Sequence, residues 1–338
     1  MLTTIALSFL VGAPASATPA QEPVPTPSAS ESPEQAAKTE LKPSLFRVLG
    51  GNVAGTERGL EGRTESWAKF DRVLGDTFLR MRYHQFKADG SLNYSMVQLF
   101  LPLADNKIEA WFFDEMGETS SWSGTISDRG MQLTTSSADG TIVGEQVYEW
   151  TNGGYQFRLM GFGPAGAEGG LIEYLSGEYE PTSKWRPLPA NANLEKSARA
   201  LPFGWYLGSF RGKEISIYGA SDGVMSTTLG PGPWFYTEYN SAVKGEVVFS
   251  GLGFVSASKN GDFTLHWFEQ GGAHSIIEGK VLADGNTNAL VRNEDGEVIE
   301  RHTDTRTGED SYTFSIKQLD ETSGEWKLFM TGNYLRHP

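Results

Sequence analysis

Cysteine is absent from the 338-residue chain. Its absence excludes disulfides, thiolate metal sites, a cysteine nucleophile and a lipid anchor on an N-terminal cysteine. Basic residues are also few, because 28 Lys and Arg stand against 42 Asp and Glu and leave a formal net charge of −14. Since this charge repels phosphate backbones and no Lys/Arg cluster opposes it, we expect no nucleic-acid partner.

Extended helical stretches rich in Ala, Leu, Glu and Lys are nearly absent. The chain instead has 40 Gly, 19 Phe and 9 Trp, with a hydrophobic fraction of 38%. Aromatic and β-branched residues between frequent glycines are typical of strands joined by tight turns. The length suits about two domains. We therefore predict an all-β protein whose stability comes from burial of apolar side chains.

Residues 1–17 form an apolar run that ends in small residues, Ala13-Pro14-Ala15-Ser16-Ala17. This pattern predicts a signal peptide cut after Ala17 and hence a periplasmic or secreted protein, and the alternative is an apolar tail. The run is too short to cross a bilayer, so we expect no integral membrane segment in the mature protein. Residues 18–43 are rich in Pro, Ser and Glu and predict a flexible linker.

An internal repeat with a shift of roughly 155 residues is the most informative feature. Four pairs of segments match: Leu74-Gly75 with Leu229-Gly230, Ile108–Phe112 with Thr264–Phe268, Tyr155-Gln156-Phe157 with Tyr312-Thr313-Phe314, and Gly177-Glu178-Tyr179 with Gly332-Asn333-Tyr334. The predicted copies are residues 45–181 and 201–336. Residues 182–200 would link them through a short helix capped by Asn193.

Each copy is expected to hold about ten strands. In residues 76–86 of copy one, Leu79, Met81 and Tyr83 alternate with Arg80 and Arg82, a pattern that predicts a strand with one solvated face. Turn signals such as Asp89-Gly90 and Asp139-Gly140 recur at intervals that leave no room for crossover helices. Such a long antiparallel meander normally closes on itself, so we predict two tandem up-and-down β-barrels.

The chain resembles the calycin-like bacterial domains of unknown function, which are distantly similar to nitrobindin, fatty-acid-binding and lipocalin barrels. The resemblance rests on a predicted opening strand at Gly204-Trp205-Tyr206-Leu207-Gly208, the Leu-Gly before an aromatic strand, the central Trp-Phe strand and the closing Gly-x-Tyr. It implies closed barrels with an internal cavity and no established common activity. Copy one departs at Gly51–Gly55, which has no Trp.

Nitrobindin-like barrels bind haem through a histidine, so the resemblance raises the question of a haem site. The chain has five histidines, none of them shared between the copies: His84, His266, His274, His302 and His337. We expect His84 and His266 to be solvated on outer faces. We therefore predict no cofactor, with haem as the alternative, and no metal site.

A ligand site is predicted from charged and aromatic residues on the strands. Arginines pointing into a lumen could hold a carboxylate, and aromatic residues there would make it apolar. The candidates for ligand binding are Arg80, Arg82, Tyr83, Trp111, Phe113, Trp267, Phe268 and Tyr236. The other interpretation places the arginines on a barrel exterior and the aromatic residues in two filled cores.

Three functions remain open from the sequence. The first is a non-enzymatic binder of a small apolar or amphipathic ligand, and the second is an interaction module with filled barrels. The third is a hydrolase or isomerase at a barrel mouth, for which Glu300, His302 and Asp304 on one strand face are the only indication. No catalytic residue is assigned, and the oligomeric state is left open.

Overall fold

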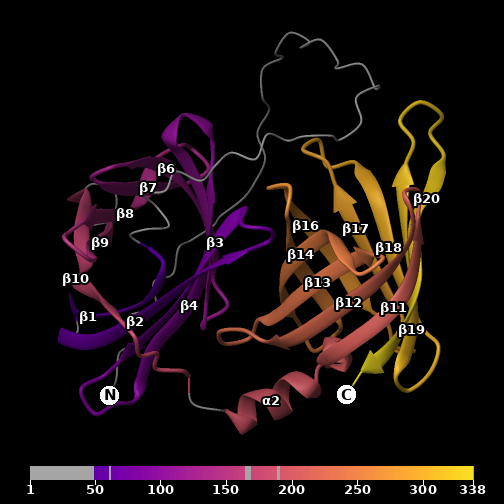
Figure 1. Ribbon diagram of the computed structural model, residues 1–338, viewed down its shortest axis with the longest axis horizontal. Coiled ribbons are helices and arrows are strands. Elements are labelled where there is room, and N and C mark those ends of the chain that lie inside the picture. Colours follow the sequence, from indigo (N-terminus) through magenta and orange to yellow (C-terminus); the bar gives the residue numbers. More distant parts are fainter. Residues whose placement is uncertain (1–48, 61, 164–168, 189–190, 338) are drawn as a thin grey trace.

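The protein consists of two closed antiparallel barrels of ten strands each (Figure 1). The computed structural model describes residues 49–60, 62–163, 169–188 and 191–337. Barrel 1 contains β1 (Gly51–Gly59), β2 (Gly62–Val73), β3 (Phe78–Phe86), β4 (Leu92–Pro102), β5 (Lys107–Asp114), β6 (Thr119–Ser127), β7 (Gly130–Ser136), β8 (Ile142–Trp150), β9 (Tyr155–Phe162) and β10 (Leu171–Thr182). Barrel 2 contains β11 (Gly208–Ser216), β12 (Gly219–Leu229), β13 (Phe235–Val243), β14 (Glu246–Ala257), β15 (Asp262–Glu269), β16 (His274–Val281), β17 (Thr287–Arg292), β18 (Val298–Arg306), β19 (Ser311–Leu319) and β20 (Trp326–His337). The predicted fold class is confirmed.

Both barrels close by pairing their first strand with their last. Gly55 of β1 lies opposite Tyr179 of β10, and Gly212 of β11 lies opposite Tyr334 of β20. The matching registers align Gly51 with Gly208, because Gly51 pairs with Phe70 and Gly208 with Thr227. The expectation that Gly51–Gly55 matches Gly204–Gly208 is therefore wrong. The position that corresponds to Trp205 is residue 48, outside the described residues.

The short turns follow from their sequences. Gly90 and Gly140 both have φ +83°, a left-handed conformation that glycine adopts without a steric penalty. In each turn the preceding aspartate accepts a hydrogen bond from a backbone N–H two residues on, at 2.9 Å from Ser91 and 3.0 Å from Thr141. The Asp-Gly turn signals thus become hairpin turns, as predicted.

The lumen of barrel 1 is filled by a single apolar cluster. Phe70, Met81, Phe100, Trp122 and Tyr148 all belong to it and are at most 6% exposed. They come from β2, β3, β4, β6 and β8, so they reach the lumen from most of its circumference. Barrel 1 therefore has the packed interior of an ordinary β core.

Barrel 2 is closed at one end by η3 (Pro202–Tyr206), a 3₁₀ turn that precedes β11. The Phe203 ring packs against Phe235 at 5.1 Å and against Phe263 at 5.2 Å between ring centroids. Arg336 fixes this turn by donating hydrogen bonds to the carbonyls of Leu207 and Trp205. The predicted opening strand at Gly204–Gly208 is thus wrong, because this segment turns inward to bury its aromatic side chains.

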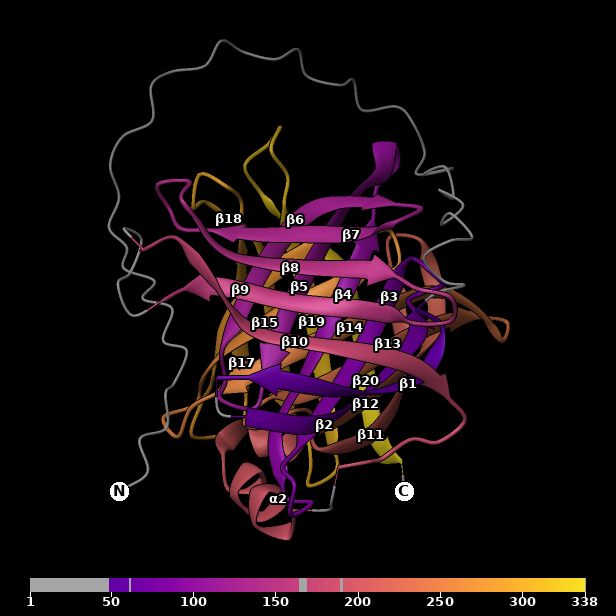
Figure 2. The ribbon, with the colours of Figure 1, turned by 90° about the vertical axis from the view of Figure 1, so that its left-hand side faces the viewer.

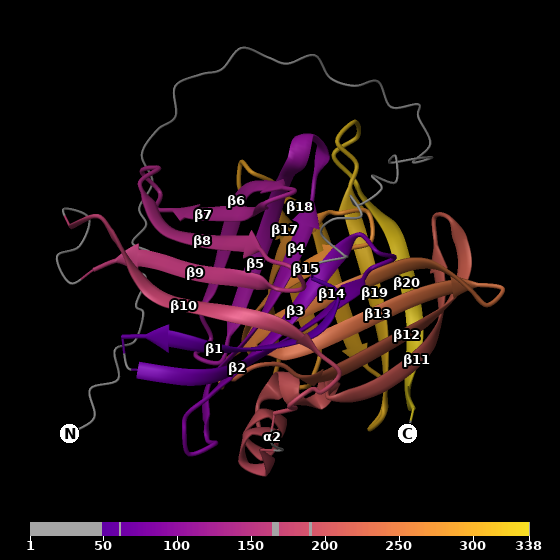
Figure 3. The same cartoon turned by 60° about the vertical axis from the view of Figure 1, so that its left-hand side comes forward.

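The helix α2 (Ala192–Arg199) precedes this turn and lies at the base of barrel 2 in Figures 1 and 3. Its N-cap is Asn191, whose side chain accepts a hydrogen bond from the backbone N–H of Leu194 at 3.0 Å. The predicted cap, Asn193, instead lies in the first turn of the helix.

The described residues contain no helix that is both long and apolar enough to span a bilayer. The predicted signal peptide and Pro-rich linker lie outside the described residues.

The outer faces of β3–β5 and β13–β15 form one apolar interface between the barrels (Figures 1 and 3). Phe113 stacks on Phe254 with ring centroids 4.0 Å apart and an interplanar angle of 6°. Phe268 packs edge-on against Phe78 at 5.8 Å. The indole N–H of Trp234 donates to the carbonyl of Asp114 at 2.9 Å. Figure 2 shows barrel 1 in front of barrel 2, with β7–β10 on the side of barrel 1 that is turned away from barrel 2.

The prediction that β3 has a solvated face is wrong, because both of its faces are buried. Tyr83 points into barrel 1, as its alternation with the arginines requires. On the opposite face, Arg80 is covered by barrel 2 and His84 by the chain that follows β10. The His84 ring lies 4.7 Å from the ring of Trp185, and its Nδ1 is 3.1 Å from the carbonyl of Arg186. Non-local contacts of this kind leave no mark on strand periodicity.

We expect the free energy of unfolding to fall as the pH is lowered from about 7 to about 5. His266 and His274 stack at 5.6 Å in the interface. Burial lowers the pKa of both, to about 4 for His274, whose pKa the neighbouring His266 lowers further. The unfolded chain, with histidine pKa values near 6.5, therefore binds protons in this range that the folded chain does not.

Urea unfolding at several pH values would measure this dependence. The stabilisation is fully present above pH ~6.5 and is lost progressively towards the folded pKa. His274→Phe should reduce the slope without removing it, because burial also lowers the pKa of His84. An unchanged slope in this variant would contradict the assignment to His274.

Candidate functional site

A buried carboxylate lies inside barrel 1. Glu57 on β1 is fully buried. Its Oε2 accepts hydrogen bonds from the hydroxyls of Ser66 and Tyr83 and, at 2.7 Å, from the side-chain amide of Gln85. Its Oε1 accepts a hydrogen bond from the hydroxyl of Tyr179. Four donors therefore satisfy this carboxylate without a cation.

Barrel 2 repeats this arrangement around Glu214, which is 1% exposed. Tyr239 and Tyr334 donate to its Oε1, Tyr239 at 2.6 Å, and Ser221 and Ser241 donate to its Oε2, each at 2.9 Å. Glu214, Tyr239 and Tyr334 occupy the repeat positions of Glu57, Tyr83 and Tyr179. We call each set of a glutamate and its donors a carboxylate cradle.

The cradles are parts of the interior. Burial raises the pKa of Tyr83, Tyr179 and Tyr239, so these phenols stay protonated donors at neutral pH. Removing a buried carboxylate from water costs several kcal/mol unless hydrogen bonds replace the lost hydration. The donors fulfil that need, and the cradles tie β1 to β10 and β11 to β20, where each barrel closes.

A second polar group lies on β18 in barrel 2. Glu300, His302 and Asp304 all point into the lumen, since they pair with the inward-facing Val291, Ala289 and Thr287. His302 Nε2 lies 2.9 Å from Glu300 Oε2, and Gln318 donates to Glu300 Oε1 at 2.7 Å. The hydrogen bond to His302 lowers the pKa of Glu300.

Asp304 lies apart from that pair, at the end of barrel 2 that η3 closes; we call η3 the plug. Tyr206 of η3 donates to its carboxylate at 2.6 Å and lies 2.8 Å from the hydroxyl of Thr287. Burial raises the pKa of Asp304. The structure thus brings Glu300 and His302 into contact and assigns Asp304 to the plug.

Aromatic rings line the inner wall formed by β13–β15. Tyr239 lies 5.9 Å from Phe249 and 6.2 Å from Trp267 between ring centroids, and all three rings are partly exposed. Glu269 follows Trp267 on the same face of β15 and pairs with the inward-facing Gly251. Burial raises the pKa of Glu269, and the nearby charge of Glu300 adds to this effect.

Barrel 1 has no charged residues at the corresponding positions. The counterparts of Glu300, His302 and Asp304 on β8 are Gly144, Gln146 and Tyr148. Gln146 accepts a hydrogen bond from Gln98 of β4 at 3.2 Å, and both glutamines are buried. This contact crosses the lumen of barrel 1, so the two lumens differ in polarity and in how completely they are filled.

The eight residues predicted to bind a ligand separate into three groups. Tyr83 is in the cradle of barrel 1, and Trp267 lines the lumen of barrel 2. Trp111, Phe113, Phe268, Arg80 and Tyr236 meet in the interface, where the hydroxyl of Tyr236 accepts a hydrogen bond from Arg80. Arg82 lies on the same outer face and donates to Asp71 at 3.2 Å. Whether any of the eight contacts a ligand stays a prediction.

The histidines are less solvated than expected. His84 is 7% exposed under Trp185 and Arg186, and His266 is partly buried in the interface. Within the described ranges, no group of three or more His, Asp or Glu side chains could hold a metal ion. The expectations of no metal and no haem stay predictions.

Sequence reasoning missed Glu57 and Glu214. Both lie in polar strand segments that look solvated, Thr56-Glu57-Arg58 and Lys213-Glu214-Ile215. One signal could have found them: extending the repeat alignment to the first strand of each copy gives an identical glutamate in the middle of each strand. A charged residue shared by both copies, between immediate neighbours that differ, indicates a shared structural role.

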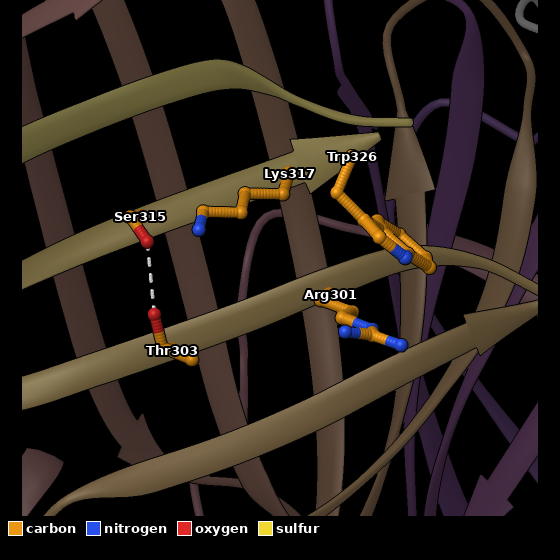
Figure 4. Close-up of a pocket in the computed structure, with 5 residues that line it drawn as sticks. All are labelled: Arg301, Thr303, Ser315, Lys317 and Trp326. Atoms are coloured by element: carbon orange, nitrogen blue, oxygen red, sulfur yellow. Dashed lines mark hydrogen bonds between the residues drawn. The ribbon is translucent and has the colours of Figure 1, made fainter. Parts of the chain in front are cut away.

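A hollow of about 420 Å³ lies on the outer wall of barrel 2 (Figure 4). Arg301 stacks over the Trp326 ring at 4.0 Å, and the hydroxyls of Thr303 and Ser315 are 2.9 Å apart. Lys317 completes the lining. Because Arg301 and Thr303 alternate with Glu300, His302 and Asp304 along β18, this hollow faces away from the lumen.

No family model and no curated protein matches this chain. It is similar to the structure of Rv2717c from M. tuberculosis, with 14% identity, 42% of this chain and 98% of that chain covered and a TM-score of 0.34. A protein of unknown function from the DUF3598 family of Nostoc punctiforme covers 85% of this chain and 96% of its own, with 9% identity and a TM-score of 0.30. The S-type phycobiliprotein lyase CPES from Guillardia theta covers 44% and 99%, with 10% identity and a TM-score of 0.31. The two ten-stranded barrels agree with the calycin-like resemblance read from the sequence.

Proposed function

We propose that barrel 2 binds a small amphipathic molecule at the open end of its lumen, opposite the η3 plug. The observation that carries this proposal is the exposure of inward-facing side chains. Glu300 and His302 point into a closed barrel, yet their side chains are each 25% exposed. Glu300 and His302 are also partly exposed as whole residues, whereas Gln146, the counterpart of His302 in barrel 1, is buried. Solvent therefore reaches this wall of barrel 2 through the mouth.

The wall around that space has both apolar and polar sides, as small-molecule sites usually do. The apolar side chains that point inward and keep partial exposure include Phe249, Leu265, Trp267, Ile316 and Met330. The polar side consists of Glu300, His302 and Gln318. A ligand with an apolar body and one polar group matches this division.

An interaction module with filled barrels would need large aromatic residues on both faces of several strands, so that one face is free to bind a partner. That condition holds for β3–β5 and β13–β15, but the outer faces of these strands cover each other. No observation favours this function over ligand binding. The hydrolase or isomerase hypothesis, which rests on Glu300, His302 and Asp304, stays a prediction, and the structure brings Glu300 and His302 of these three into contact.

Isothermal titration of the full chain with three ten-carbon amphiphiles, 1-decanol, decanoate and decyltrimethylammonium, tests the proposal. We expect at least one to bind with a stoichiometry of one, since barrel 1 is filled. Trp267→Ala should weaken that binding about tenfold, because burial of an aromatic side chain against the ligand contributes at least the ~1.4 kcal/mol that a factor of ten requires.

Phe112→Ala is the matched control, because strand register makes the partly buried Phe112 the counterpart of Trp267 in barrel 1. The predicted match of Ile108–Phe112 with Thr264–Phe268 is therefore wrong by one residue. It should leave the dissociation constants unchanged. The proposal is overturned if none of the three amphiphiles binds, or if the two substitutions weaken binding equally.

A further inference from the structure

We propose that the ligand of barrel 2 carries a cationic head group of the ammonium type, held between Glu269, Glu300 and the rings of Tyr239, Phe249 and Trp267. This inference rests on the proposed function and names the chemical class of its ligand. It draws on two independent features of the lumen, the sign of its charges and the aromatic rings beside them.

The charged side chains that point into barrel 2 above the plug are carboxylates and one histidine. They are Glu214, Glu269, Glu300, Asp304 and His302. The arginines that face the same lumen lie at the plugged end and are held there, Arg336 by the carbonyls of Trp205 and Leu207 and Arg306 by those of Gly308 and Glu309. Lys327 lies at the rim and pairs with Asp320.

The carboxylates are not equally available. Glu214 accepts four hydrogen bonds in its cradle, and Asp304 is bound by Tyr206. Glu300 forms hydrogen bonds with His302 and Gln318 and remains partly exposed, and Glu269 forms one with the side chain of Trp267. In the described part of the chain, neither Glu269 nor Glu300 forms an ion pair with a lysine or arginine. A ligand cation would supply that missing partner for both.

The aromatic rings provide the second feature. A cation that lies over an aromatic face within about 6 Å gains roughly 0.5–2 kcal/mol, and aromatic cages are a common means of recognising quaternary ammonium groups. The Tyr239 ring lies 5.9 Å from Phe249 and 6.2 Å from Trp267. These three partly exposed rings share the inner wall of β13–β15 with Glu269, so one head group can contact both the rings and the carboxylate.

At the positions of Glu269 and Glu300, barrel 1 has no carboxylate that is available to a ligand. Its counterpart of Glu269 is Asp114, whose Oδ1 accepts backbone N–H groups of Met116 and Glu118, each at 2.9 Å, in the β5–β6 turn. Its counterpart of Glu300 is Gly144. Of the two carboxylates, the counterpart of Glu269 is therefore used in a turn and the counterpart of Glu300 is absent. The proposed cation site belongs to barrel 2 and has no equivalent in barrel 1.

The same three amphiphiles test this inference when their affinities are compared within each variant. We expect decyltrimethylammonium to bind at least about tenfold more tightly than 1-decanol, and decanoate to bind most weakly. Added NaCl should reduce the preference for the ammonium, because salt screens the partly exposed carboxylates. Glu269→Gln and Glu300→Gln should each reduce the ammonium-to-decanol affinity ratio at least threefold. A loss of folded protein would affect both probes alike and leave that ratio unchanged.

Glu278→Gln is the matched control, because Glu278 is exposed on the outer wall of β16 and its substitution changes the net charge equally. It should leave the ratio unchanged. Equal binding of decanol and the ammonium, or an equal effect of Glu278→Gln and Glu269→Gln, overturns the cationic head group but not the ligand-binding function. Failure of all three amphiphiles to bind overturns both.

Discussion

Replacing either cradle glutamate by alanine is expected to lower the free energy of unfolding of its barrel by about 3–5 kcal/mol, because each buried donor left without an acceptor costs about 1–3 kcal/mol and the cavity adds to that cost. Glu57→Ala leaves the hydroxyls of Tyr83 and Tyr179 without an acceptor, and Glu214→Ala does the same to Tyr239 and Tyr334. The cost combines unsatisfied buried donors with the cavity left by the side chain.

Urea unfolding followed by tryptophan fluorescence measures this loss. Tyr334→Phe removes one hydrogen bond to a charged group and should cost about 1.5–3 kcal/mol, less than Glu214→Ala. Glu178→Ala and Glu278→Ala are controls on the outer walls, where both side chains are exposed. A cradle variant whose stability lies within about 0.5 kcal/mol of the unsubstituted protein would show that the cradle hydrogen bonds contribute little beyond what water supplies.

Much of the fold follows from local patterns. Strands have a side-chain period of two, and Asp-Gly turns allow only a narrow set of backbone conformations, so both leave a direct trace in the sequence. The repeat adds a second sequence for each predicted strand and turn, because both copies must fit the same barrel. These signals are sufficient for two closed barrels of about ten strands, and the structure has ten in each.

The two faces of a strand cannot be assigned from its period alone. Alternation separates Tyr83 from Arg80 on β3, but it does not reveal that a second barrel covers Arg80 or that Trp185 covers His84. The same limit applies to Gly204–Gly208, whose glycines and aromatics suit a strand as well as a 3₁₀ turn. Each of these outcomes depends on contacts between segments that are far apart in the chain.

The interface between the barrels gives the second large expected effect. Phe113→Ala should destabilise the protein by about 3–5 kcal/mol, the usual cost of truncating a fully buried phenylalanine. Phe113 is 0% exposed and contacts Phe254, Phe268 and Trp234, all of them from barrel 2. The loss therefore falls on the contact between the barrels rather than on the interior of either one.

Phe100→Ala is the matched control for this experiment. Phe100 is also 0% exposed, but it belongs to the core cluster inside barrel 1. Both substitutions should lower stability by similar amounts. Only Phe113→Ala should increase the radius of gyration measured by small-angle X-ray scattering, because only it loosens one barrel from the other.

The coupling between Phe113 and Phe254 can be isolated by a double-mutant cycle. Their rings stack at 4.0 Å, so we expect an interaction energy of about 0.5–1.5 kcal/mol beyond the area that each buries. Additive effects would mean that the interface is held by general apolar burial and not by this pair. An increased radius of gyration in Phe100→Ala as well would mean that the packing of barrel 1 and its docking on barrel 2 are one cooperative unit, and the two barrels would then unfold together.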